Sequence, residues 1–268
     1  MHIDTAKKLV TEQLDTLSTA LANGQSDQLK DYLTAMARFH RYSVSNVFLI
    51  LLQQPEATHI AGYHTWRSVG RQVKEGEKGI AIIAPMSVKK EAEGPAETKD
   101  SNEERAIRFR TAYVFDISQT EGEPLPSIGQ AAGDPGSFAD RLKNLVKQMS
   151  IELEFADELG GALGVSRGGR ITIQSGLSPA QEFSVLVHEL AHEILHQKKG
   201  QEKPSKTVRE TQAEAVAYIV AQGIGLDAGT SSADYIQLYQ GDAKTLVHSL
   251  EEIRQAATEI LSSLLSDE

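Results

Sequence analysis

The chain has 268 residues, of which 40% are hydrophobic and 24% charged; this is typical of a globular protein with one large domain or two modest ones. It has no cysteine, which excludes disulfide bonds and cysteine-ligated zinc sites. Its apolar runs are far shorter than a membrane span, and the start "MHIDTAKKLV" lacks the apolar core of a signal peptide. We therefore expect a cytoplasmic protein with no membrane partner.

The charge of the chain is unevenly distributed. The net charge of −10 argues weakly, for the chain as a whole, against binding to nucleic acid. Residues 38–90, however, contain eight Lys and Arg against three Asp and Glu, a local net charge of +5. A basic segment inside an acidic chain is a candidate binding surface.

The first half of the chain predicts a mixture of helices and strands. Apolar residues at helical spacing predict helices over 4–22, from 27 to about 39, and over 45–54, where Pro55 ends the third. The segments "HIAGY", "GIAIIAPMSV" and "RTAYVFDIS" are rich in β-branched and aromatic residues and predict strands. The acidic stretch 91–105 between the last two predicts an exposed loop. We predict an N-terminal α+β domain over 1–125.

A break in composition follows. The stretch "QTEGEPLPSIGQAAGDPGS", 119–137, is rich in Gly, Pro and Ser, and we take 126–137 as a linker. A helix from about 138, the strands "IELEF" and "RITIQ", and helices around 179–196, 206–222 and 243–265 come next. The fold class is therefore α+β with two domains, the second (138–268) mostly helical with a small sheet.

The helix "LSPAQEFSVLVHELAHEILH" contains the pattern H-E-x-x-H. His188 and His192 are four residues apart, so they project from one face and can bind one Zn²⁺ or another divalent ion. Glu189 can act as general base toward water at such a site. His196 lies about 12 Å along the helix from His188, too far to share the ion, and is assigned to supporting or packing contacts. The alternative is a surface helix in which the histidines occur at this spacing by chance.

A catalytic zinc site usually has three protein ligands, so one is missing. The segment "KTVRETQAEAVAYIVAQGIGL" predicts a buried helix with Glu210 and Glu214 one turn apart. We predict Glu210 as the third ligand and Glu214 as a hydrogen-bond partner of a ligand histidine, with the exchanged roles as the alternative. An exposed pair of acids is the third possibility.

The basic segment contains the only tryptophan. Trp66 has Tyr42, Tyr63, Arg67, Arg71, Lys74 and Lys78 close by in sequence. Aromatic rings interleaved with cations are typical of surfaces that bind single-stranded nucleic acid, where bases stack and cations follow the phosphates. From composition alone, a half-buried tryptophan beside a solvated basic face is at least as good an explanation.

Two resemblances bear on these alternatives. The H-E-L-A-H pattern followed by E-x-x-A-E-A-V-A resembles IrrE/ImmA-like and SprT-like zincin metallopeptidase domains over roughly 138–225, which implies a zinc site with a Glu ligand from the following helix. Y-S-x-x-N, Q-x-P-x-A-T and G-Y-x-x-W-x-x-x-G-R-x-V-x-x-G-E-K-G-I resemble the single-stranded-DNA-binding domain of ArdC-type antirestriction proteins over about 5–125. This second match adds Asn46 to the predicted DNA-binding residues.

The two resemblances together imply a single-stranded-DNA-binding antirestriction protein that protects DNA entering with a plasmid, as in conjugation, or with a phage. They also imply a zinc-dependent hydrolase that acts on a protein or peptide. Two alternatives stay open: a metallopeptidase that cleaves a repressor or a DNA-bound protein, and a DNA-binding protein whose metal site is structural and catalytically silent.

Overall fold

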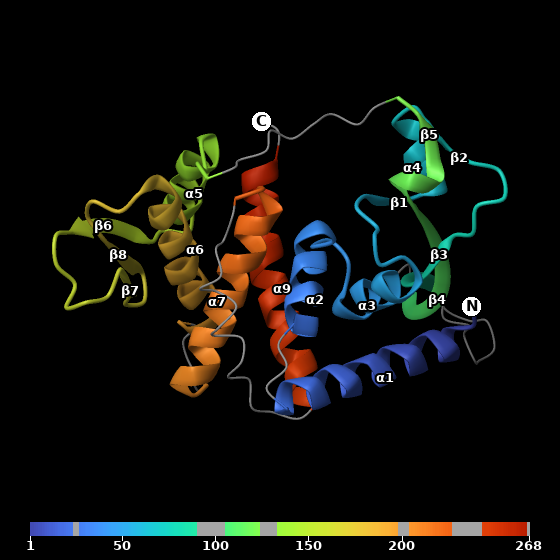
Figure 1. Cartoon of the computed structure of the whole chain (residues 1–268), viewed down its shortest axis with the longest axis horizontal. Coiled ribbons are helices and arrows are strands. Elements are labelled where there is room, and N and C mark those ends of the chain that lie inside the picture. The colour runs from blue at the N-terminus through green and yellow to red at the C-terminus, as the bar shows by residue number, and fades with distance from the viewer. Residues whose placement is uncertain (24–26, 90–104, 124–132, 198–203, 227–242, 267–268) are drawn as a thin grey trace, which may run out of the picture. The chain divides into compact units, whose positions relative to one another are not determined.

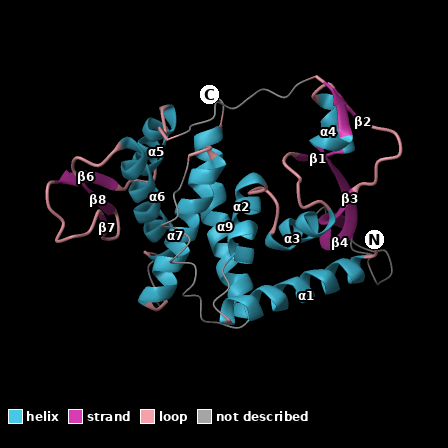
Figure 2. Cartoon of the chain, viewed as in Figure 1, coloured by secondary structure: helices cyan, strands magenta, loops and turns pink. Residues whose placement is uncertain are grey.

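A computed structural model describes residues 1–23, 27–89, 105–123, 133–197, 204–226 and 243–266 (Figure 1). Contacts divide the chain into two compact units. The first contains Met1–Glu12 and Phe48–Leu125, and the second contains Gln13–Val47 and Pro126–Glu268. Helices and small sheets occur together, which confirms the α+β class (Figure 2). Among the described helices, none has an apolar stretch long enough to cross a membrane.

The first unit is built around antiparallel strands. Strands β1 (Ile60–Gly62), β4 (Arg105–Asp116) and β3 (Ile80–Lys89) form a sheet in the order β1-β4-β3. A separate ribbon pairs β2 (Arg71–Val73) with β5 (Thr120–Gly122). The short helix α4 (Tyr63–Ser68) lies between β1 and β2 in the chain, and the one-turn 3-10 helix η1 (Ile117–Gln119) follows β4. The sequence predicted β1, β3 and β4 but missed β2, β5 and α4. These missed segments of three to six residues are too short to show periodicity, and unlike β1 they lie in no run of β-branched and aromatic residues.

Polar side chains hold the sheet of the first unit in place. Gln53 bonds both backbone groups of Ala81 on β3, because its amide nitrogen donates to the carbonyl at 2.9 Å and its oxygen accepts from the N–H at 2.9 Å. This amide takes the place of a neighbouring strand at the sheet edge. Asp116, at the end of β4, is 2% exposed and accepts from the backbone N–H groups of Thr58, His59 and Ser118. Gln53 thereby holds the outer edge of β3, and Asp116 holds the segment that leads into β1.

The second unit is mostly helical. Its helices are α2 (Asp27–Arg38), α5 (Ser137–Gln148), α6 (Pro179–His196), α7 (Lys206–Gly223) and α9 (Ala243–Leu265), while α1 (Ile3–Ala22) and α3 (Val44–Gln53) each continue across the division between the units. Helix α7 packs against α6, α9 and α2 (Figure 1). Residues 211–221 of α7 are buried except for Glu214, and most of them are apolar, as expected for a helix that forms part of a core. A carboxylate in such surroundings requires a partner.

The sheet of the second unit has three strands in the order β6-β8-β7. Strand β8 (Arg170–Gln174) pairs in parallel with β6 (Glu152–Ala156) and antiparallel with β7 (Gly164–Ser166). Both β7 and β8 contact α6. The predicted strands "IELEF" and "RITIQ" correspond to β6 and β8, whereas the three-residue β7 was not predicted.

Residues 13–47 pack with the second unit rather than with the first. Thr34 of α2 and Tyr218 of α7 share a hydrogen bond at 2.8 Å, and the carbonyl of His40 accepts from Arg254 and Thr258 of α9. The predicted domain of 1–125 is continuous in sequence, but these packing contacts are long-range and leave no sequence pattern. The division into domains at 126–137 stays a prediction, and residues 126–132 lie outside the described part.

Candidate functional site

The histidine helix begins as its sequence predicts. Ser178 caps α6, its side chain accepts from the Gln181 N–H, and the Gln181 side chain bonds back to Ser178. The apolar residues Phe183, Leu186, Val187, Leu190 and Ala191 are buried. The buried side of α6 fixes the rotation of the helix, and this rotation directs His188 and His192 toward α7.

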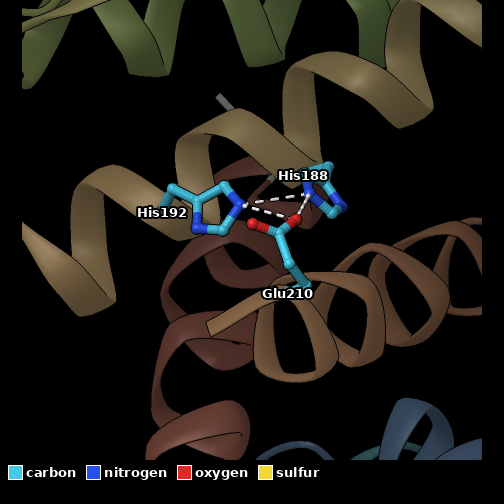
Figure 3. Close-up of side chains that lie close together, drawn as sticks. All are labelled: His188, His192 and Glu210. Atoms are coloured by element: carbon cyan, nitrogen blue, oxygen red, sulfur yellow. Dashed lines mark hydrogen bonds and ion pairs between the residues drawn. The ribbon is translucent and has the colours of Figure 1, made fainter. Parts of the chain in front are cut away.

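Three ligand-type side chains converge between α6 and α7 (Figure 3). The Nε2 atoms of His188 and His192 lie 3.1 Å apart. The Glu210 Oε2 atom lies 3.5 Å from the first and 3.6 Å from the second. Ligand atoms about 2.1 Å from a tetrahedral ion are about 3.4 Å from one another, so this triangle has the dimensions of a metal site. These residues would hold the ion.

Glu214 bonds the opposite side of the His188 ring. Its Oε2 atom lies 3.1 Å from His188 Nδ1. Because a carboxylate only accepts, His188 carries its proton on Nδ1 and its Nε2 lone pair faces His192 and Glu210. Two imidazole nitrogens 3.1 Å apart with lone pairs directed at each other repel unless a cation or a proton lies between them. The donor set therefore fits a divalent metal ion.

The pKa values of the two histidines are shifted in opposite directions. Burial lowers the pKa of His188, but its hydrogen bond to Glu214 and the Glu189, Glu214 and Glu210 carboxylates outweigh burial, so this pKa is raised. The pKa of His192 is lowered, first by burial and then by the charge of His188. Of the two rings His188 is therefore the more readily protonated, and a second proton on it would occupy Nε2, the atom directed at His192 and Glu210.

Glu189 is 7% exposed and lies beneath the edge strand β7. Burial raises the pKa of its carboxyl group, although His188 and a hydrogen bond from the Ser166 backbone N–H act in the opposite direction. A Cβ on Gly164 would lie 2.6 Å from Val185 Cγ1 and 2.8 Å from Glu189 Cγ, so only glycine allows β7 this close to α6. A carboxyl group with a raised pKa is suited to general-base chemistry near neutral pH.

Sequence reasoning missed Glu193, which anchors β7. Its carboxylate accepts from Ser166 Oγ at 2.6 Å, from the Gly168 N–H at 2.8 Å and from the Gly169 N–H at 2.7 Å. Successive backbone N–H groups in such a glycine turn form a small anion-binding nest. The pair of glycines in "SRGGR" indicates such a turn in the sequence, but it does not show which carboxylate the turn would bind.

His196 packs beside the site without entering it. It is 5% exposed, its ring lies 5.5 Å from that of His192, and it hydrogen-bonds to the backbone of Arg209, the residue before Glu210. Burial, followed by the charge of His192, lowers the pKa of His196 to about 4, so the ring is neutral near pH 7. The supporting role predicted for His196 is compatible with this position.

The predicted DNA-binding residues belong to both units and differ in exposure. Trp66 is 3% exposed and its Nε1 donates to the Phe115 carbonyl at 2.9 Å, so its ring is part of the core and cannot stack on bases. Asn46 is 6% exposed and, with the half-buried Tyr42, belongs to the second unit. Tyr63 is 41% exposed. Because both side chains are buried, the structure does not support a direct DNA contact for Trp66 or Asn46. Their proximity in sequence to basic and aromatic residues did not reveal this burial.

The basic members of this set remain at the surface of the first unit. Arg71 binds β5, since its guanidinium donates to Thr120 and to the carbonyls of Gly122 and Glu123. The Lys74 ammonium donates to the Ser118 carbonyl at 2.8 Å. Arg67, Lys74 and Lys78 are exposed, and Arg67 and Arg71 line a shallow hollow of about 370 Å³. Arg71 and Lys74 thus have structural partners, and DNA contact by this group stays a prediction.

Fold and site define a two-part protein whose second part has a metallopeptidase-like fold. Comparison with known families is consistent with this class. Residues 5–115 match the N-terminal domain of anti-restriction factor ArdC, and residues 146–221 match the IrrE N-terminal-like domain. The predicted resemblance to ArdC-type antirestriction proteins and to IrrE-like domains is therefore confirmed.

Solved structures and a curated relative extend the comparison. The metal-free crystal structure of antirestriction protein ArdC from plasmid R388 has a TM-score of 0.51 and 19% identity, covering 83% of this chain and 85% of that one. Its Mn(II)-bound structure has a TM-score of 0.47 and 18% identity, with 85% and 86% coverage. An uncharacterized Bacillus anthracis protein is 27% identical over 301 residues, 96% of this chain and 51% of the relative. The chain thus spans about half the length of the curated relative it matches.

Proposed function

We propose that this protein binds single-stranded DNA in the cytoplasm and protects incoming plasmid or phage DNA from restriction. The observation that carries the proposal is the pairing, in one chain, of an ArdC-type N-terminal domain with an IrrE-like domain. The local charge of +5 over residues 38–90 supports a nucleic-acid partner, because cations of a binding surface neutralise phosphates. Binding should therefore weaken as salt concentration rises.

We further propose that His188, His192 and Glu210 hold Zn²⁺ or another divalent ion, and that the second part hydrolyses a protein or peptide. Their geometry supports this assignment. When bound, such an ion supplies Lewis-acid activation of a carbonyl group and of water. Glu189 would take a proton from the attacking water and deliver it to the leaving amine, a role that its raised pKa supports. Glu214 would keep the His188 proton on Nδ1.

One experiment separates the two parts of the proposal. Wild-type protein, Glu189→Gln and a control with the exposed Glu158→Gln are compared for divalent-metal content, for binding of single-stranded and duplex DNA, and for protection of incoming DNA in a restricting host. We expect all three proteins to bind metal and single strands. Absence of single-strand binding in the wild-type protein would overturn the DNA part.

The same variants decide whether hydrolysis serves protection. Loss of protection in folded Glu189→Gln, with DNA binding retained, supports a peptidase that acts in antirestriction. Full protection by Glu189→Gln supports the alternative of a DNA-binding protein with a catalytically silent metal site. Cleavage of a repressor or a DNA-bound protein that depends on added single-stranded DNA would favour the remaining alternative.

A further inference from the structure

An apolar face of β4 is exposed. Ile107, Phe109 and Tyr113 are 72%, 56% and 51% exposed. They occupy alternate positions of one strand, so they lie on the same face of the β3–β4 hairpin. Among the described residues eight large hydrophobic side chains are exposed, and three of the eight are on this face. Clustered exposure of this kind marks an interaction surface rather than scattered surface residues.

The charges of the hairpin are almost all positive. Within β3 and β4 the charged residues are Lys89, Arg105, Arg108, Arg110 and Asp116. Asp116 is buried and bonded to three backbone N–H groups, so it contributes little to the surface. Arg108 and Arg110 are exposed and alternate with the apolar residues, on the other face of the same strand. A partner of this hairpin is therefore expected to be negatively charged.

The backbone arrangement allows an extended ligand to reach both sets of side chains. β1 pairs with β4 only over Val114–Asp116, so in the described residues β4 has β3 alone beside it over 107–111. A chain that follows the open edge of β4 would meet rings on one side and guanidinium groups on the other. Gly79 lies against this face, because a Cβ there would be 2.9 Å from Tyr113 Cβ, and the exposed Lys78 precedes it. A third cation thus directly precedes the residue that packs against Tyr113.

We propose that this hairpin surface, formed by Ile107, Phe109, Tyr113, Arg108 and Arg110, is where single-stranded DNA binds. The inference rests on the proposed DNA-binding function and assigns it to residues outside the basic segment 38–90. Exposed rings stack on unpaired bases, whereas in a duplex the bases are already stacked on each other. The buried Trp66 helps to hold the hairpin in place, because its Nε1 donates a hydrogen bond to the carbonyl of Phe115 on β4.

The test is a binding titration of the full chain with a labelled oligothymidylate and with a duplex of the same length. Loss of one stacked ring is expected to weaken single-strand binding about 5- to 150-fold, so Phe109→Ala and Tyr113→Ala should each fall in this range. Phe109→Tyr should retain affinity and Phe109→Leu should lose it, which separates ring stacking from apolar contact. Arg108→Gln with Arg110→Gln should lower the slope of log affinity against log salt by about 1.4.

The matched control is Phe155→Ala, a 48% exposed aromatic residue of the second unit, which should bind like the wild type. Circular dichroism checks that each variant is folded, and sedimentation checks that its oligomeric state is unchanged. Wild-type binding to single strands with unchanged affinity in the Phe109 and Tyr113 variants would overturn the surface assignment and leave the proposed function standing. Preference for duplex, or a self-association lost in the variants, would also overturn it. A wild type that binds no single strands would overturn both.

Discussion

Substitution of Glu210 and Glu214, one at a time, tests the geometry of the proposed metal site. Glu210 Oε2 lies 3.5 and 3.6 Å from the two Nε2 atoms, whereas Glu214 Oε2 lies 3.1 Å from Nδ1 of His188, on the other side of that ring. An ion placed between the Nε2 atoms can therefore reach Glu210 and not Glu214. We predict that Glu210→Gln weakens metal binding more than Glu214→Gln does.

The expected magnitudes follow from these positions. Loss of a group that orients a ligand typically costs about 10- to 100-fold in affinity, or about 1.4–2.7 kcal/mol, and this is the range expected for Glu214→Gln. Glu210→Gln removes a charged ligand and should exceed that range. Competition with a chromophoric chelator, using Zn²⁺ and separately Mn²⁺, measures both affinities against wild type and the Glu158→Gln control. A larger loss in Glu214→Gln would refute the assignment of Glu210 as ligand.

Three further predictions concern stability. Trp66→Ala should destabilise the first unit by about 3–5 kcal/mol and Trp66→Phe by less, as followed by circular dichroism in denaturant; a loss below about 1 kcal/mol for alanine would contradict the buried position. Gly164→Ala should lower the free energy of unfolding, measured by thermal denaturation, by about 1–3 kcal/mol, because the added Cβ forces β7 away from Glu189. Metal affinity should be nearly unchanged. A variant as stable as the wild type would refute the close packing. Burial opposes ionisation of Asp116, but hydrogen bonds from Ser118 and the backbone outweigh it and hold its pKa below the usual value. The stabilisation by ionised Asp116 is therefore complete above about pH 4 and is lost as pH falls through the lowered pKa. Asp116→Asn should lower the free energy of unfolding near pH 7 and make it depend less on pH in the acid range. An equal dependence on acid pH in wild type and variant would argue against this role.

The elements that the sequence predicted are those with strong local signals. The Ser178 cap, the Gln181 capping box and the apolar periodicity of α6 are all local features, and α6 begins and ends where they indicate. Long helices such as α9 and strands such as β3 show enough periodicity to be recognised. The short elements β7 and α4 depend on contacts with distant residues and were missed.

The spacing of His188 and His192 by itself determined that both could face one ion, because four residues make about one helical turn. It also excluded His196, by the rise of the helix. The sequence favoured Glu210 over Glu214 as the third ligand but left the exchanged roles open, because the two lie one turn apart. Only the rotation of α7 against α6 places Glu210 on the Nε2 side of His188 and Glu214 on its Nδ1 side.

The first unit of the chain shows the same limit in stronger form. Composition marked residues 38–90 as basic and aromatic, and the motif resemblance identified the type of domain. Burial of Trp66 and exposure of Phe109 and Tyr113 depend on which face of each strand and helix meets the core. The sequence determined the chemistry available to this protein, whereas the tertiary structure decided which side chains remain in contact with solvent, because burial results from packing between segments far apart in the chain.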